Sequence, residues 1–169
     1  FNKQLDSFVD FFGFYPHYID GHHNVHQYPG VDIFLLEAIK EKLTGKRFYV
    51  RNTSVSIKNA IKQGSNFFKI IPISLWGIQY KKLLKSNSIH TNNSFMGIYN
   101  WRTPELFGDS FKGFLRMSSP KNGIIMTHPG FPDDLLIKRD RFNVGRQMEF
   151  DYLNKVKMEK IIESMIILP

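Results

Sequence analysis

The sequence predicts an α/β fold with parallel strands. Two observations lead to this prediction: short strand-like runs alternate with helical patterns, and both histidine-bearing loops follow predicted strands. The 169 residues show no internal repeat or low-complexity linker, so we expect a single domain over residues 1–169. Hydrophobic residues make up 42% of the chain and include sixteen phenylalanines, which is enough for a packed, aromatic-rich interior.

The first third of the chain alternates between helix and strand. Apolar residues at spacings of three and four predict a helix over residues 1–12. The segment "PHYID" (16–20) is expected to form a short strand. The clearest helix of the sequence spans Val31–Leu43 and is closed by Gly45. Strand formers then gather in "RFYVRN" (47–52).

The middle of the chain is expected to be mainly helical. A helix over Ser54–Gln63 begins with Ser54 as its N-cap. A second helix covers residues 67–85 and is expected to be interrupted at Pro72, which lacks a backbone N–H. An extended segment, "SIHTNNSFMGIYN" (88–100), follows this helix.

The last third returns to the alternation of helix and strand. Thr103 as N-cap and Pro104 at the first helical position predict a helix start. A short apolar strand is expected over Asn122–His128, followed by a loop containing "PDD", which we interpret as a turn. A helix over residues 143–164 and a final strand over 165–169 complete the prediction.

Half of the six histidines lie in "IDGHHNVHQYPG" (19–30), as His22, His23 and His26. Neutral imidazole is a common ligand of transition metals, and His22 and His26 are close enough in sequence to converge. Asp20 could accept the N–H of one ring. The spacing supports metal binding or catalysis no more strongly than it supports three partly buried histidines bonded to backbone carbonyls.

A further histidine, His128, ends the strand "IIMT" and precedes a Pro-Gly turn. The carboxyl ends of parallel strands carry the chemistry in α/β barrels and open sheets. A histidine at this position is well placed for proton transfer. In the alternative interpretation, the His128 ring only forms hydrogen bonds to the backbone of its loop.

The composition limits the partners. The net charge is +8 and the pI about 9.6, but the lysines are scattered and no RNA-binding aromatic signature accompanies them, so nucleic acid is not expected. There are no cysteines, which excludes disulfides and thiolate metal sites. No apolar stretch approaches about 18 residues and no signal peptide is recognisable, so we expect no membrane partner and a cytoplasmic location.

Five segments in the same order resemble the YdjC-like (ChbG-type) carbohydrate deacetylases. They are the histidine segment 17–31, the strand "FYVRN" (48–52), "TNNSFMGIYN" (91–100), "IIMTHPG" (124–130) and the helix "RQMEFDYL" (146–153). The resemblance covers nearly the whole chain. It implies a partial (β/α) barrel of the glycoside hydrolase/deacetylase type, which hydrolyses the acetamide of an amino sugar or chito-oligosaccharide with a divalent metal, expected to be magnesium.

The resemblance also assigns roles to individual residues. His22 matches a metal-binding histidine, and His128 matches the histidine that protonates the leaving amine. Asp20, His23, His26 and Arg51 match positions that line or support the pocket. Two positions depart from the family pattern, because Asn24 stands where many members have histidine and Asn93 where aspartate is common.

Two family segments are missing from this sequence. The opening Asn-Ala-Asp-Asp-Phe-Gly strand supplies the general base and a metal ligand, and an early Gly-x-His-x-x-x-Thr segment supplies another ligand; neither occurs here. We therefore expect a single incomplete YdjC-like deacetylase domain, missing its first strands and weakly active or inactive alone. A separate N-terminal fragment as a partner, a disrupted gene and a piece of a longer protein all stay open.

Two alternatives to an enzyme stay open as well. The chain could be a non-catalytic basic module that binds a glycan or an anionic polymer, or it could have no function by itself. The aromatic residues that could stack on sugars are more simply interpreted as core; they are Trp76, Tyr80, Tyr99 and Trp101. Arg146 and Glu149 are three residues apart on a predicted helix. They could form an exposed ion pair that contributes little to stability, or, in the family interpretation, they could anchor the helix near the pocket.

Overall fold

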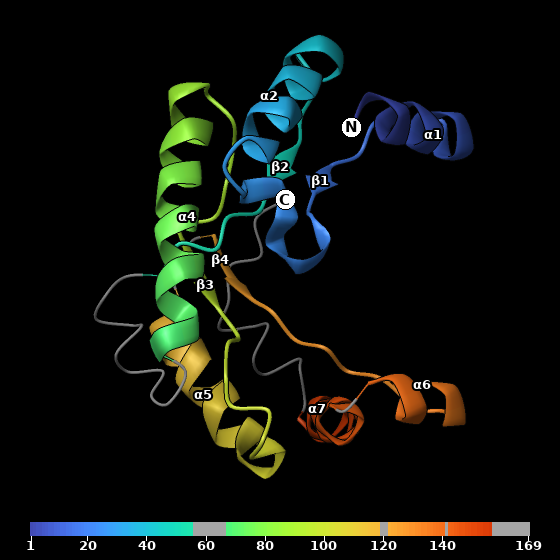
Figure 1. The fold of residues 1–169 in the computed structure, drawn as a ribbon, viewed down its shortest axis with the longest axis vertical. Coiled ribbons are helices and arrows are strands. Elements are labelled where there is room, and N and C mark those ends of the chain that lie inside the picture. Colours follow the sequence, from blue (N-terminus) through green and yellow to red (C-terminus); the bar gives the residue numbers. More distant parts are fainter. Residues whose placement is uncertain (56–66, 119–121, 141, 157–169) are drawn as a thin grey trace. The chain divides into compact units, whose positions relative to one another are not determined.

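The computed structural model describes residues 1–55, 67–118, 122–140 and 142–156, and shows a mixed α/β fold (Figure 1). The chain divides into two compact units. Unit 1 comprises Phe1–Ser54 and Pro72–Asn92, and unit 2 comprises Val55–Ile71 and Asn93–Pro169. Among the described residues, no helix is both long enough and apolar enough to cross a membrane.

Unit 1 is built around two short parallel strands. Its elements are α1 (Asn2–Phe12), β1 (Tyr18–Ile19), the 3₁₀ helix η1 (His22–Gln27), α2 (Val31–Lys42), β2 (Tyr49–Val50) and most of α4 (Phe67–Ser86). Tyr18 pairs with Tyr49 and Ile19 with Val50, and α2 makes the crossover between the two strands. Val50 also pairs in parallel with Thr91, so a third extended segment lies beside β2.

The core of unit 1 joins the helices to these strands. Apolar residues of α1, α2, β2 and α4 and of the segments after the two long helices form one buried cluster. Half of its members come from α2 and the residue that follows it. The cluster consists of Leu5, Leu35, Leu36, Ala38, Ile39, Leu43, Val50, Tyr80, Leu84 and Ile89. The i, i+3 and i+4 spacing of Leu35, Leu36 and Ile39 places them on one face of α2. This packing holds the carboxyl ends of β1 and β2 in place.

The expected interruption at Pro72 is wrong, because α4 runs through this residue from Phe67 to Ser86. Proline removes only one backbone hydrogen bond from the ladder. Beyond it, the helix is stabilised by burial of Tyr80 and Leu84 in the core of unit 1. The division between the two units falls at this proline, between Ile71 and Pro72.

Unit 2 repeats the same strand–helix–strand unit. It contains β3 (Ser94–Met96), η3 (Pro104–Leu106), α5 (Phe107–Met117), β4 (Gly123–Ile125), α6 (Asp134–Arg139) and α7 (Asn143–Lys155). β3 and β4 are parallel, with Phe95 opposite Ile124, and α5 makes the crossover. One face of α5 buries Phe107, Phe111 and Phe114 against Tyr99 and Met96. A smaller cluster contains Val55, Ile70 and Phe95.

Most sequence-based expectations for these elements are confirmed, with element ends shifted by one to three residues. The helix starting after Thr103 divides into η3 and α5, and α6 was not foreseen. In the "PDD" segment, which was expected to form a turn, Asp133 is the N-cap of α6 and Asp134 its first residue; the Asp133 carboxylate accepts the Leu136 N–H at 2.7 Å. Ser54 and Val55, where the expected helix over Ser54–Gln63 would begin, are not helical, and the rest of that helix lies outside the described residues. The expected strand over 165–169 and the end of the last helix lie outside them as well.

Gly97 is expected to be essential for the junction of β3 and β4. Its φ is +113°, and an added Cβ would lie 2.2 Å from the Met126 carbonyl oxygen. We expect Gly97→Ala to lower the free energy of unfolding of unit 2 by about 2–3 kcal/mol, because the backbones of the two strand ends must separate. Gly113, inside α5, is the matched control, since its Cβ would meet nothing closer than 4.0 Å.

Urea unfolding followed by tryptophan fluorescence measures both substitutions. The chain has two tryptophans, Trp76 in unit 1 and Trp101 in unit 2, so a Trp76→Phe background reports on unit 2 alone. Gly113→Ala is expected to stabilise unit 2 by about 0.5–1 kcal/mol because alanine is the better helix former. Equal effects of the two substitutions would contradict the close approach at Gly97.

Candidate active site

The candidate residues follow the carboxyl ends of parallel strands in both units. In unit 1, Asp20 and the three histidines come after β1, and Arg51 comes directly after β2. In unit 2, His128 comes three residues after β4. The expectation that both histidine-bearing loops leave the carboxyl ends of strands is therefore confirmed.

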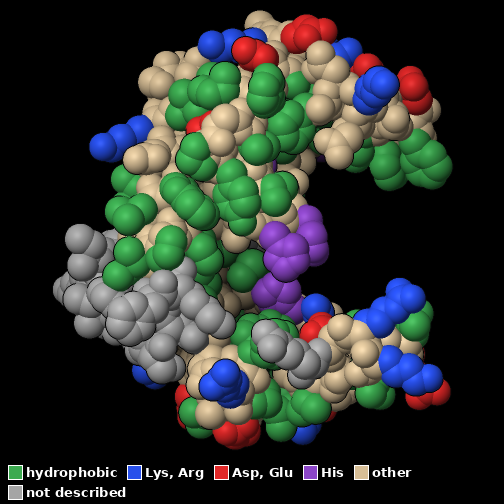
Figure 2. All heavy atoms as spheres, viewed as in Figure 1, with side chains coloured by type: hydrophobic (Ala, Val, Ile, Leu, Met, Phe, Trp, Pro, Cys, Tyr) green, Lys and Arg blue, Asp and Glu red, His purple; other side chains and the backbone are tan. Residues whose placement is uncertain are grey.

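The three histidines of the first loop differ in their environments. His22 and His23 are exposed, and their rings meet edge to face with centroids 4.2 Å apart. Histidine side chains, purple in Figure 2, reach the surface in that view. His26 is buried, and its ring packs edge to face against Tyr80. Only the first two imidazoles are accessible to a ligand in solution.

His26 uses both ring nitrogens within the protein. Its Nδ1 accepts the Gly21 N–H at 3.0 Å, which assigns the ring hydrogen to Nε2. Nε2 then donates to the Arg51 carbonyl at 2.8 Å. Burial lowers the pKa of His26 from its ordinary value, so the neutral ring is favoured. His26 therefore ties the loop after β1 to the end of β2, and is not available as a metal ligand.

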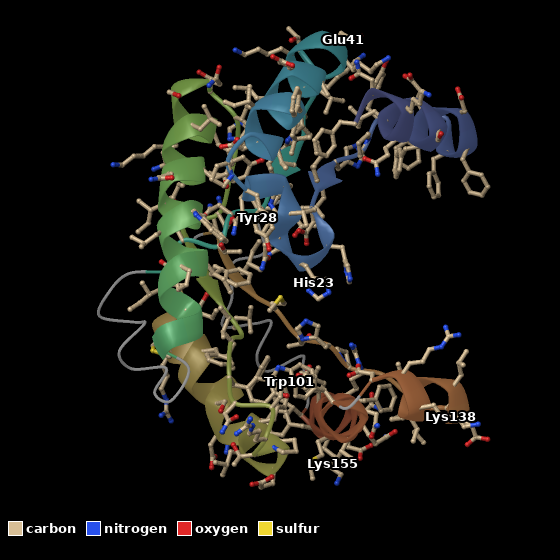
Figure 3. All side chains as sticks on the ribbon, viewed as in Figure 1. His23, Tyr28, Glu41, Trp101, Lys138 and Lys155 are labelled. Atoms are coloured by element: carbon tan, nitrogen blue, oxygen red, sulfur yellow. The ribbon has the colours of Figure 1, made fainter. Side chains whose placement is uncertain are left out.

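The backbone of this loop is unusual where the exposed histidines lie. His23 and Asn24 both have left-handed conformations, with φ of 52° and 63°. Such conformations are uncommon for residues other than glycine and cluster at functional sites. The Tyr28 hydroxyl donates to the His23 carbonyl at 3.2 Å, and Figure 3 labels both residues on this segment. Gly21 is needed beside them, because an added Cβ would lie 2.6 Å from His26 Nδ1.

Asp20 and Arg51 form an ion pair across β1 and β2. An Arg51 Nη2 hydrogen is donated to Asp20 Oδ1 at 2.5 Å, with Arg51 buried and Asp20 exposed. The expectation that Asp20 orients one of the histidine rings is wrong. Asp20 Oδ1 lies 3.9 Å from His26 Nδ1, whose lone pair is already occupied by Gly21, and the guanidinium is the stronger donor. Asp20 thus connects the first loop to Arg51.

The tyrosines of β1 and β2 lie beside this ion pair. The rings of Tyr18 and Tyr49 stack with centroids 5.4 Å apart, and the Tyr18 hydroxyl donates to Asp20 Oδ2 at 3.4 Å. Burial raises the pKa of Tyr18 to about 12, with the Asp20 charge acting in the same direction. Tyr18 therefore stays a neutral hydrogen-bond donor to the carboxylate at physiological pH.

A buried network of amides and hydroxyls lies under the same strand ends. Asn52 and Asn92 are fully buried, and each bonds to the backbone of the other: Asn52 Nδ2 donates to the Asn92 carbonyl and Asn92 Nδ2 to the Asn52 carbonyl, both at 2.8 Å. Asn52 Oδ1 accepts both the Ser54 N–H and its hydroxyl. The Gln27 amide donates to the Thr53 hydroxyl at 2.5 Å.

This network was not among the features predicted from the sequence. The signal was present, because "RNTS" (51–54) and "HTNN" (90–93) each place a run of small polar residues directly after an extended segment. What connects the two runs is a tertiary contact between residues about forty positions apart, which no local pattern reveals.

In unit 2, the His128 backbone is held by a buried carboxylate. Glu149 Oε2 accepts the His128 N–H, and Glu149 Oε1 accepts the Tyr99 hydroxyl at 2.7 Å. Glu149 is completely buried. Burial raises the pKa of its carboxyl above the usual range, while the hydrogen bonds from His128 and Tyr99 oppose that shift. α7 is thus fastened to the loop that carries His128.

Aromatic and charged side chains also lie near His128. Its ring packs edge to face against Trp101 with centroids 5.2 Å apart; Figure 3 labels Trp101 near α7. Arg146 Nε donates to Asp140 Oδ2 at 2.8 Å. Hydrogen bonds from the Phe142 N–H and from Arg146 lower the pKa of Asp140, and the charge of His128 contributes in the same direction.

The expected exposed pair of Arg146 and Glu149 is wrong. Arg146 pairs with Asp140 and Glu149 is buried against His128 and Tyr99. The other interpretation, in which this helix is anchored beside the pocket residues, agrees with the contacts of Glu149. Among the four aromatic residues considered as sugar platforms, Tyr80 and Tyr99 are buried, Trp101 is partly buried and Trp76 is exposed.

The described residues do not by themselves fit a magnesium ion. Within the described ranges, no three side chains of His, Cys, Asp or Glu come together as a group that could hold a metal. His26 has both nitrogens occupied, and Asp20 is paired with Arg51. His22 and His23 are exposed and offer two imidazoles, whereas magnesium prefers several oxygen ligands. Because His22 and His128 belong to different units, their meeting in one pocket stays a prediction.

Comparison with protein families decides where this chain belongs. The model of the family described as "YdjC-like protein" matches residues 1–164. The chain belongs to the YdjC-like family. Comparison with curated proteins and with solved structures gives no match. The YdjC-like family is known as carbohydrate deacetylase-like, which places this chain among the carbohydrate-related hydrolases at family level.

Proposed function

We propose that this YdjC-like chain takes part in the hydrolysis of an acetamide group on an N-acetylated amino sugar or chito-oligosaccharide. The observation that supports this most directly is the placement of His128, in a family known as carbohydrate deacetylase-like, at the carboxyl end of β4. The pairing of successive parallel strands through helical crossovers supports a further proposal, that the units are parts of a (β/α) barrel.

In this proposal His128 is the general acid. Water attacks the acetamide carbonyl carbon, the carbon–nitrogen bond breaks, and the departing nitrogen must gain a proton to leave as an amine. The protonated imidazole of His128 supplies that proton, and acetate and the free amino sugar are the products. Trp101 restricts the position of the His128 ring. The hydrogen bond that holds the His128 backbone also limits where the imidazole N–H can be presented to the substrate.

The metal and the base come from outside the described residues in this proposal. The family resemblance implies magnesium and assigns His22 as a metal ligand; the His22 side chain is exposed. We propose that a segment carrying Asp-Asp-Phe-Gly supplies the base and the oxygen ligands, either on a separate polypeptide or on a longer form of this chain. The chain alone is then expected to have weak activity or none.

The test is acetate release from N,N′-diacetylchitobiose. The purified chain is assayed with magnesium, alone and mixed with an N-terminal fragment of a YdjC-like protein that carries Asp-Asp-Phe-Gly. We expect acetate only from the mixture, and a loss of about a hundredfold in kcat with His128→Asn, because one general acid contributes at least that much. His90→Asn is the matched control, since His90 is exposed and lies outside the candidate site. No acetate from the mixture, or equal rates for both variants, would contradict the proposal.

One observation favours a second function, non-catalytic glycan binding. Trp76 is 37% exposed and its ring lies against Tyr28, with centroids 5.0 Å apart. Hydrophobic side chains, green in Figure 2, gather over α2 and α4, and Ile33, Phe34 and Leu75 are among the exposed ones. An exposed tryptophan supported by a partly buried tyrosine can stack on a sugar ring. Glycan binding that is lost with Trp76→Ala and unaffected by His128→Asn would favour this function over hydrolysis.

A further inference from the structure

We propose that Glu149 is a positioning residue for His128: its carboxylate fixes the backbone from which the imidazole projects, and Tyr99 fixes the carboxylate. The role of His128 as an acid rests on the function proposed above. The positioning itself rests only on contacts within unit 2.

Each oxygen of the Glu149 carboxylate accepts a hydrogen bond, and the two donors come from different parts of unit 2. One oxygen accepts the His128 N–H, which lies 21 residues earlier in the chain, and the other accepts the Tyr99 hydroxyl, 50 residues earlier. A buried carboxylate is costly unless its oxygens are satisfied. A hydrogen bond to a carboxylate is stronger than one to a neutral acceptor, so the backbone of this loop is firmly held at His128.

The same face of α7 also limits where the His128 ring can lie. Gly145 and Glu149 are four residues apart and therefore neighbours on that face. A Cβ at Gly145 would lie 2.7 Å from the Trp101 ring, so the absence of a side chain there lets Trp101 pack directly on the helix. Trp101 in turn contacts the His128 ring. One helical turn thus fixes both the backbone of His128 and the aromatic ring beside its imidazole.

Two substitutions of Glu149 separate positioning from simple loss of structure. Glu149→Gln keeps the shape: its amide oxygen can accept the His128 N–H, and its NH₂ can donate to the Tyr99 hydroxyl, which is also an acceptor. Glu149→Ala removes both contacts. Tyr99→Phe is a third variant, which leaves the His128 contact in place but removes the second donor.

Amide hydrogen exchange measured by NMR on the whole chain is the first readout. We expect the His128 amide to exchange at least about a hundredfold faster in Glu149→Ala, at a rate close to that of the original in Glu149→Gln, and at an intermediate rate in Tyr99→Phe. The Met126 N–H, bonded to the Met96 carbonyl at 2.9 Å, is the internal control. Acceleration of both amides to the same degree, or the absence of any acceleration at His128, would overturn the proposal.

Turnover is the second readout, and it separates this proposal from the proposed function. In the mixture that releases acetate, we expect Glu149→Ala to lower kcat about tenfold with KM unchanged, and Glu149→Gln to restore most of it. A fall in kcat that Gln does not restore would overturn positioning. If no mixture releases acetate, the proposed function fails while the exchange measurement still decides whether Glu149 holds His128. Should Glu149→Ala fail to fold, the Gln and Phe variants provide the same exchange comparison.

Discussion

Replacing His26 by alanine is expected to lower the free energy of unfolding of unit 1 by about 4 kcal/mol. The substitution removes the acceptor of the partly buried Gly21 N–H and the imidazole donor to the Arg51 carbonyl, and each hydrogen bond lost in a buried setting costs about 1–3 kcal/mol. It also leaves a cavity beside Tyr80, where the buried imidazole packed. The loop after β1 would then lose its connection to the end of β2.

His22 offers a matched control for His26 within the same loop. His22 is exposed, and His22→Ala is expected to change the unfolding free energy by no more than about 0.5 kcal/mol. Urea unfolding followed through Trp76, in a Trp101→Phe background, measures both variants in unit 1. If the two alanine variants were equally stable, the assignment of His26 as the structural histidine of the cluster would be wrong.

The same histidine makes unit 1 sensitive to acid. Because burial lowers the pKa of His26 below its ordinary value of 6.5, the unfolded chain takes up a proton more readily than the folded chain as the pH falls. Stability from this group is therefore present above pH 6.5 and is lost as the pH falls through the folded-state pKa. We expect His26→Gln to reduce the fall in the unfolding free energy of unit 1 between pH 7.5 and pH 5. We expect His22→Gln to leave that fall unchanged.

The second large effect is expected at Asn52, where leucine should lower the unfolding free energy of unit 1 by about 5 kcal/mol. Leucine has a similar volume but can neither donate to Thr91 and Asn92 nor accept from Ser54. Several buried polar groups would lose their partners at once, in an environment where each unmade hydrogen bond is costly. Burial of the leucine side chain recovers only part of this loss.

Asn87 is the control for this substitution because it lies in unit 1 and also uses its side-chain amide as a donor. Its Nδ2 donates to the Leu83 carbonyl at the end of α4, where solvent can replace the contact. Asn87→Leu is expected to cost at most about 1 kcal/mol. Both variants are compared by urea unfolding through Trp76. A small effect at Asn52, comparable with that at Asn87, would show that solvent reaches the amide network.

Local patterns determined the elements of this protein. The spacing of Leu35, Leu36 and Ile39, and of Phe107, Phe111 and Phe114, follows the helical period, so the helices that carry them could be read directly. The same holds for the placement of histidines after strands. The motifs around His22 and His128 also pointed to the family, since each motif is short and continuous in the sequence.

Only the tertiary structure decided which polar groups meet. Asp20 pairs with Arg51, 31 residues away, and not with the neighbouring His26. Glu149 accepts hydrogen bonds from His128 and Tyr99 and does not pair with Arg146. Residues in one short motif therefore differ in role: His26 is structural while His22 is exposed. The physical reason is that a buried hydrogen-bonding group is satisfied by whichever donor or acceptor the fold brings within about 3 Å, and that distance is set by packing of the whole chain.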